Sequence, residues 1–201
     1  MESVIGMSGP RNRSGFTLLE LVVVVAILVV LAEVVIPLVA GIRENSASVA
    51  TTANLQAMRA AIVGGDGRLG YLSDMGQLPG SVRDIFVMPA GAATFNPLTG
   101  RGWRGPYMMD ATGTYQINVG QGFTSAYGAA GDPAVLDAWG QPIVIQAPTN
   151  APDSNTQQQF TRLVSAGPDG IIQTPPGQLY PTPSQRGDDV LLFLMRADTA
   201  P

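Results

Sequence analysis

The sequence predicts an α+β fold, with one long helix near the N-terminus and a small antiparallel sheet of about three strands in the C-terminal third. An apolar block followed by helical periodicity, across residues 16–65, predicts the helix. Three short apolar segments, at residues 141–146, 160–166 and 190–195, are separated by turn-rich stretches, as strands are. Three antiparallel strands packed on a helix form a small α+β head.

The composition limits the chemistry that we expect of the chain. Its 201 residues carry a net charge of −4, which argues against nucleic acid as a partner because phosphate binding requires a basic surface. The sequence contains neither cysteine nor histidine. A disulfide framework, His/Cys zinc sites and Ser-His-Asp triads are therefore excluded. Because no nucleophile–base set is left, we predict that the chain is not an enzyme.

The apolar block at residues 16–40 predicts a transmembrane helix. About 20 apolar residues are enough to cross the bilayer core as a helix, and this block is long enough. Arg11 and Arg13 precede the block. By the positive-inside rule, the N-terminus then stays in the cytoplasm and the chain after the block lies on the other side of the membrane.

Glu20 separates three interpretations of this block. A cleaved secretory signal has an apolar core of about 7–15 residues and an A-x-A-like site, whereas this block is longer and has no clear site of that kind. A plain signal anchor fits the length but leaves Glu20 unexplained, because a carboxylate inside a membrane helix costs about 2.5–3.5 kcal/mol. The third interpretation gives this carboxylate a role. A second carboxylate, Glu33, is compatible with hydration at the membrane interface or with a contact of its own.

The segment S-G-F-T-L-L-E at residues 14–20 resembles the processing site of type IV prepilins and type II secretion pseudopilins. The resemblance implies that a prepilin peptidase removes residues 1–15 as a leader, cuts between Gly15 and Phe16, and methylates the new amino group. Glu20 then pairs with the N-terminal ammonium of a neighbouring subunit, which offsets the cost of two charges in an apolar filament core. Pro37 lies further along the block, where a proline bends or opens the helix locally and lets subunits pack.

The chain beyond the block divides into three parts. Residues 41–65 continue as an amphipathic helix into the head, and Gly64 and Gly65 end it. Its predicted apolar stripe consists of Ile42, Val49, Leu55, Met58 and Ile62. Residues 66–136 predict a variable, irregular region with short elements near 69–72 and 82–88 and a strand at 115–119. Residues 137–201 hold the sheet, in which the last strand is apolar on both faces and is therefore predicted to be central or covered.

Four segments of the second half resemble the G-type major pseudopilin of type II secretion systems. They are G-W-R-G-P-Y at 102–107, D-A-W-G-Q-P at 137–142, S-A-G-P-D-G at 165–170 and G-D-D-V at 187–190. The resemblance implies the pilin-like form of the α+β fold. The last loop is longer here than in the family pattern, because it carries four inserted prolines between residues 175 and 183.

The same resemblance implies a calcium site in this last loop. Its ligands would be Asp169, Asp188, Asp189 and the backbone carbonyl of Ala166. Calcium takes six to eight oxygen ligands, and the carboxylates stand at the start and the end of one loop, which an ion would hold closed. The residues alone leave another interpretation open, because Pro-Asp-Gly is a common turn and Gly-Asp-Asp before a strand fits a solvated edge.

These observations predict a structural subunit of a type II secretion pseudopilus. It would be a single-pass protein of the bacterial inner membrane whose head lies in the periplasm, and it would polymerise through its N-terminal helix. The expected partners are other copies of the chain, other pseudopilins, the prepilin peptidase, an inner-membrane assembly platform and, before assembly, membrane lipid. Two alternatives stay open: a major or minor pilin of a type IV pilus, and a membrane-anchored periplasmic binding domain that never polymerises.

Overall fold

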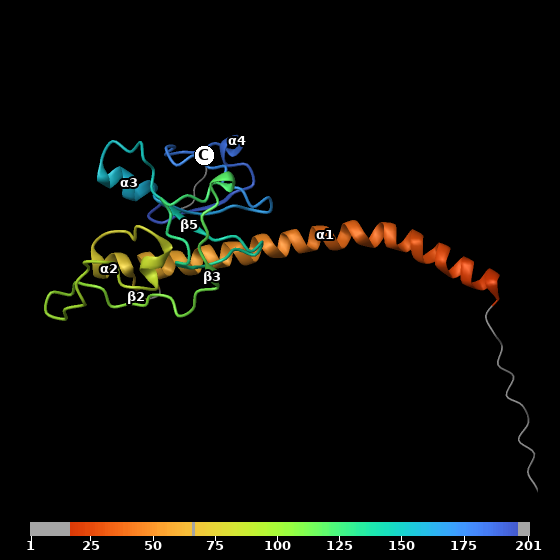
Figure 1. Ribbon diagram of the computed structural model, residues 1–201, viewed down its shortest axis with the longest axis horizontal. Helices are drawn as coiled ribbons and strands as arrows, with labels where there is room; N and C mark the ends of the chain where they lie inside the picture. The colour runs from red at the N-terminus through yellow and green to blue at the C-terminus, as the bar shows by residue number, and fades with distance from the viewer. Residues whose placement is uncertain (1–16, 66, 197–201) are drawn as a thin grey trace, which may run out of the picture. The chain divides into compact units, whose positions relative to one another are not determined.

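The computed structural model describes residues 17–65 and 67–196, and the chain divides into two compact units, Met1–Arg43 and Glu44–Pro201. Helix α1 (Leu18–Val63, 46 residues) contributes to both units (Figure 1). It ends where Gly64 adopts a φ of +95°, a conformation that favours glycine. The predicted helix is therefore confirmed, and its backbone is α-helical through position 37.

In the second unit, one stripe of α1 forms part of the core. The buried residues of the stripe are Thr51, Leu55, Met58 and Ile62, each at most 1% exposed. Their spacing of four, three and four residues keeps them on one face of the helix. The predicted stripe was wrong at Ile42 and Val49, which are 58% and 68% exposed. Thr51 takes the buried position instead, because Val49 stands two residues away and so points to the opposite side.

The C-terminal sheet has three antiparallel strands, β5 (Val144–Gln146), β6 (Arg162–Ser165) and β7 (Val190–Phe193), in the order β5-β6-β7. This confirms the three predicted strands, although each is shorter than predicted. The last strand was predicted to be central or covered. It is not central, because β6 is central and β7 lies at an edge, but both of its faces are covered.

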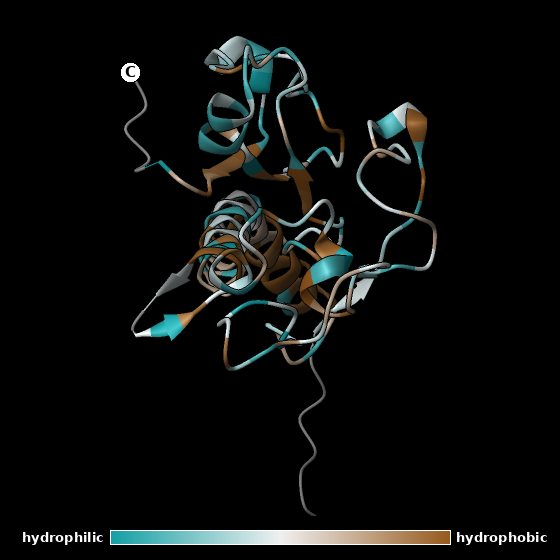
Figure 2. Cartoon of the chain, turned by 90° about the vertical axis from the view of Figure 1, so that its left-hand side faces the viewer, coloured by the Kyte–Doolittle hydropathy of each residue, from teal (hydrophilic) through white to brown (hydrophobic). Residues whose placement is uncertain are grey.

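Both faces of this sheet are covered, which explains the apolar residues on both sides of β7. Alternate residues of a strand point to opposite faces. One face joins the core that contains Leu55, Met58 and Ile62 of α1, and its strand residues are Ile145, Leu163, Val190 and Leu192. The other face packs with Tyr115 and Phe123, and its strand residues are Val144, Val164 and Leu191. Figure 2 shows the hydrophobic strands in brown beside α1.

Two short helices occupy stretches that the sequence predicted as turn-rich connections. Asp153 caps the start of helix α3 (Ser154–Phe160), because its side chain accepts the N–H of Thr156. Phe160 is the last residue of this helix and does not belong to the following strand. Helix α4 (Pro183–Arg186) lies within the proline-rich loop and begins with a proline, which is tolerated in the first helical turn.

The region at residues 66–136 contains short elements joined by long irregular segments. They are β1 (Gly64–Gly65) paired with β2 (Arg68–Leu69), α2 (Tyr71–Met75), η1 (Val82–Ile85), β3 (Gly113–Thr114) paired with β4 (Pro133–Ala134), and η2 (Val119–Gln121). The short elements predicted near 69–72 and 82–88 are thus confirmed. The strand predicted at 115–119 was wrong, because Asn118 exchanges two backbone hydrogen bonds with Phe123 and closes a tight turn around η2.

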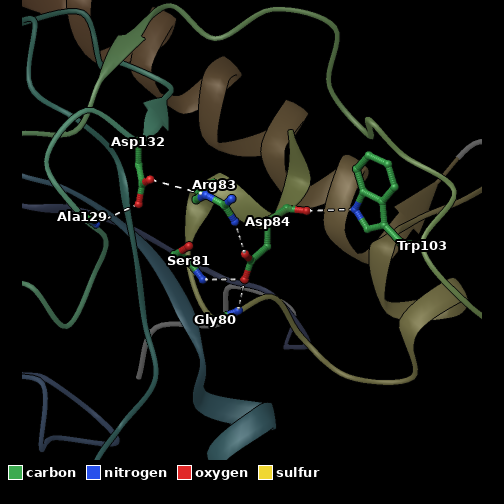
Figure 3. Close-up of polar contacts among 7 residues, drawn as sticks. All are labelled: Gly80, Ser81, Arg83, Asp84, Trp103, Ala129 and Asp132. Carbon is green, nitrogen blue, oxygen red and sulfur yellow. Dashed lines mark hydrogen bonds and ion pairs between the residues drawn. The ribbon is translucent and has the colours of Figure 1, made fainter. Parts of the chain in front are cut away.

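A polar cluster ties η1 to two distant parts of this region. Arg83 lies between Asp132, at 3.5 Å, and Asp84, at 3.8 Å, and the Trp103 indole donates to the carbonyl of Asp84 at 3.3 Å (Figure 3). Asp132 also accepts the N–H of Ala129 at 2.8 Å. The cluster therefore holds segments near residues 83, 103 and 130 together, and it accounts for the position of Trp103 as part of the head.

Candidate functional site

Glu20 forms a capping box at the start of α1. Gly15 and Phe16, the predicted processing residues, lie outside the described residues. The Glu20 carboxylate accepts the Thr17 N–H at 3.0 Å and the Thr17 hydroxyl at 3.1 Å, and that hydroxyl accepts the Glu20 N–H at 3.2 Å. Both bonds to the carboxylate go to Oε2, so among the described residues nothing donates to Oε1. The T-x-x-E pattern at positions 17–20 is a capping-box signature that our sequence analysis missed.

The first unit presents an apolar surface along α1. Every leucine, valine and isoleucine between residues 18 and 31 is 48–81% exposed. Such a continuous apolar surface requires a cover, either lipid or protein. Among the residues that the structure describes, no helix is both long and apolar enough to cross a bilayer.

Two of the sequence motifs in the second unit, at residues 137–142 and 165–170, are joined by a hydrogen bond. The Ser165 hydroxyl donates to Oδ2 of Asp137 at 2.6 Å, and both side chains are buried. The other oxygen of Asp137 accepts the N–H groups of Trp139 and Gln141, at 3.0 and 2.8 Å. The D-A-W-G-Q-P turn is therefore closed by its own aspartate and attached to the end of β6, directly before Ala166, which is itself buried.

The structure brings the predicted loop carboxylates into one hydrogen-bonded network. The Asp169 N–H donates to Oδ2 of Asp188 at 3.1 Å, so the proline-rich insertion does not separate these two residues. The side-chain amide of Gln173 donates to Oδ2 of Asp169, and its backbone N–H donates to Oδ2 of Asp189 at 3.0 Å. Gly167 allows the backbone near Asp169 to lie close to that of Asp188. It has a φ of +64°, and any side chain at this position would collide with the backbone of Asp188.

Asp189 is the buried carboxylate of the three, at 6% exposure. Its Oδ2 accepts the N–H groups of Gln173 and Thr174, at 3.0 and 2.6 Å. Burial raises the pKa of Asp189 above its ordinary value, while these hydrogen bonds act in the opposite direction. Asp188 and Asp169 are exposed at the surface of the same loop.

Three oxygens around this network are buried without a hydrogen-bond partner. Among the described residues they are the only such side-chain atoms: Oε1 of Gln173, Oγ1 of Thr174 and Oδ1 of Asp189. Buried polar atoms are normally paired, so these oxygens call for a further partner, such as an ordered water or a cation. In the described ranges no group of three or more carboxylates stands ready to hold a metal ion, so an ion in this loop would need neutral oxygens as well.

Arg162, on the central strand, fastens the inserted segment to the sheet. Its guanidinium is fully buried and donates to Oε1 of Gln146 at 2.8 Å, to the carbonyl of Gln178 at 2.8 Å and to that of Pro175 at 3.0 Å. Burial lowers the pKa of Arg162 to about 10. Our sequence analysis missed both Arg162 and Gln173. The signal for Arg162 was its position in an otherwise apolar strand.

Comparison with known proteins identifies the N-terminal segment. Residues 10–32 match the family described as the prokaryotic N-terminal methylation motif. No curated protein and no solved structure matches the chain.

The chain therefore carries the prepilin signal of type IV pilin-like proteins, and the motif indicates a precursor of the pilin or pseudopilin type. The motif implies processing by prepilin peptidase, an N-terminus anchored in the inner membrane and assembly into pilus-like polymers. Proteins of the pilin-type methylation family are structural and not catalytic. The α+β arrangement of one long helix and small antiparallel sheets is consistent with a pilin-like fold.

Proposed function

We propose that this chain is a structural subunit of a type II secretion pseudopilus, which supports protein export across the outer membrane. The methylation motif at residues 10–32 carries the proposal. The motifs that resemble a G-type pseudopilin support the choice of a pseudopilus, and two of them meet in the contact between Asp137 and Ser165. The head would lie in the periplasm, with other pseudopilins and the assembly platform as partners.

The start of α1 suits polymerisation in two respects. Oε2 of Glu20 is held by Thr17, which leaves Oε1 to accept a bond from the terminal ammonium of a neighbouring subunit. The exposed apolar residues between 18 and 31 would be covered by lipid before assembly and by neighbouring helices afterwards. Pro37 would adjust the helix at the point where subunits pack.

The proposal is tested by filament assembly with Glu20→Gln, which keeps the size of the side chain and removes its charge. We expect this variant to be processed and inserted but to form few filaments. Glu33→Gln is the matched control, because Glu33 is a second carboxylate of the same apolar block. A filament yield of Glu20→Gln equal to that of the wild type would contradict the pairing. Deleting the gene in its host distinguishes the two kinds of filament, because loss of exported proteins supports a pseudopilus and loss of surface fibres supports a type IV pilus.

We also propose that the loop at residues 166–189 binds calcium, with Asp169, Asp188, Asp189 and the carbonyl of Ala166 as its ligands. The contact between Asp169 and Asp188 and the unpaired Oδ1 of Asp189 favour this interpretation. When bound, the ion would supply positive charge that holds the carboxylates at the start and the end of the loop together. Sites outside the cytoplasm work with dissociation constants of about 10⁻⁴–10⁻³ M.

The calcium proposal is tested by thermal melting of the full chain in mild detergent, with calcium and with a chelator. A ligand that binds the folded state alone raises the melting temperature as its concentration rises. We expect calcium to raise it, magnesium to act less, and Asp188→Ala to abolish the rise. A melting temperature that does not depend on calcium would remove the site and leave the proposed filament function intact.

A further inference from the structure

We propose that Gln173, in the loop between Asp169 and Asp188, is a further ligand of the ion, and that its side-chain amide takes the place of the ion when none is bound. This inference rests on the proposed calcium site and adds a neutral side chain to its carboxylate ligands.

The first support is the place of Gln173 in the network. Its side-chain Nε2 donates to Asp169, its backbone N–H donates to Asp189 at 3.0 Å, and Asp169 is joined in turn to Asp188. Gln173 is therefore the one described residue that bridges two of the three carboxylates. An amide NH₂ carries partial positive charge, so its contact with Asp169 reproduces weakly what a cation would do there.

The second support is the set of unpaired oxygens. Oε1 of Gln173, the hydroxyl of Thr174 and Oδ1 of Asp189 are buried without donors. Asp189 and Thr174 are 6% and 2% exposed. Consecutive N–H groups of Gln173 and Thr174 both bind the other oxygen of Asp189, so these three residues are held against one another. Oxygens of a carboxylate, an amide and a hydroxyl form a hard ligand set of the kind that calcium prefers.

The third support is the room left for the amide. Gly187 has a φ of +56°, and a Cβ at this position would lie 2.5 Å from Oε1 of Gln173. Glycine therefore lets the Gln173 side chain lie against the backbone that leads to Asp188 and Asp189. Arg162 holds the carbonyls of Pro175 and Gln178, which fixes the chain just after Gln173 to the sheet.

These contacts give the Gln173 side chain a role with and without the ion. Without the ion, the NH₂ of Gln173 neutralises Asp169 in part and keeps the loop closed. With the ion bound, the carboxamide turns its oxygen toward the cation, and Asp169 exchanges the hydrogen bond from a neutral amide for contact with the cation. Gln173 thus supplies an oxygen without adding charge, which suits a site of modest affinity.

The experiment measures calcium affinity by calorimetry and by melting of the full chain in mild detergent. Gln173→Glu keeps the shape and adds a charged ligand, so we expect calcium to bind about tenfold more tightly, since ligand charge sets affinity in such sites. The same variant loses the NH₂ donor, so its melting temperature in chelator should fall below that of the wild-type chain. Gln173→Leu removes the oxygen, and we expect about tenfold weaker binding.

Gln178→Glu is the matched control, because Gln178 lies in the same loop and is exposed, and only its backbone carbonyl is engaged by Arg162. It adds the same charge without reaching the network, so its calcium affinity should stay near that of the wild type. If the wild type binds calcium and both Gln173 variants behave like Gln178→Glu, this inference is overturned while the calcium proposal stands. If the wild type does not bind calcium, the calcium proposal and this inference both fail.

Discussion

Replacing Arg162 with methionine is expected to destabilise the head by about 3 kcal/mol. The guanidinium makes four hydrogen bonds of 3.0 Å or less, two of them to Gln146 and one each to Pro175 and Gln178. At about 1.5 kcal/mol for each bond from a charged donor, they contribute about 6 kcal/mol. Burial of the charge, which lowers the pKa of Arg162 from 12.5 to about 10, opposes folding by about 3 kcal/mol and is relieved in the variant.

The assay is thermal and urea denaturation of the full chain in mild detergent, with hydrogen exchange as a local readout. A loss of this size lowers the melting temperature by about 6–12 °C for a protein of this length. Exchange should rise chiefly in the part of the loop at residues 171–187. Arg186→Met is the control, because Arg186 lies on the same insertion and contributes no side-chain bond to this network. A variant as stable as the wild type, with unchanged exchange in the insertion, would refute the role assigned to Arg162.

Two further predictions concern other buried polar groups. The buried carboxylate of Asp74 accepts two hydrogen bonds from Arg104, at 3.1 and 2.8 Å, and one from Tyr107 at 3.0 Å. Asp74→Asn weakens these contacts, so we expect it to lower the free energy of unfolding by about 2 kcal/mol in urea denaturation. An unchanged midpoint would contradict the ion pair. Burial raises the pKa of Tyr71 and of Tyr115 from 10.0 to about 12, so the folded state keeps phenol protons that the unfolded state releases above pH 10. Stability should therefore fall between pH 10 and pH 12, against the opposite and smaller effect of Arg162. The part of the tyrosinate absorbance that is lost in Tyr71→Phe or Tyr115→Phe should appear only near pH 12 in the folded chain; ionisation of both tyrosines near pH 10 without unfolding would disprove their burial.

The sequence predicted the elements that depend on local periodicity. The apolar block and the spacing of Leu55, Met58 and Ile62 indicated α1, and three apolar runs indicated the strands, because hydrophobic patterns report which face of an element is buried. The order of the strands was not predictable in this way. β7 is apolar on both faces because separate cores cover the two sides of the sheet, and this depends on how distant segments pack.

The polar parts of the candidate site were predictable only in outline. Resemblance pointed to Asp169, Asp188 and Asp189, and the structure joins them in one network. Gln173 gave no signal in the sequence, because a glutamine in a proline-rich loop is ordinarily exposed. Its position follows from backbone bonds to Asp189, which form only once the loop has closed on the sheet.

The central claim is that the chain is a prepilin-type precursor that matures at Phe16. Mass spectrometry of the N-terminal peptide, after the full chain is co-expressed with a prepilin peptidase, tests this most directly. The account predicts a mature chain that begins with N-methylated Phe16 and that is absent when the peptidase is inactive. A chain that keeps residues 1–15 in the presence of active peptidase, or that is cut after the apolar block, would contradict it.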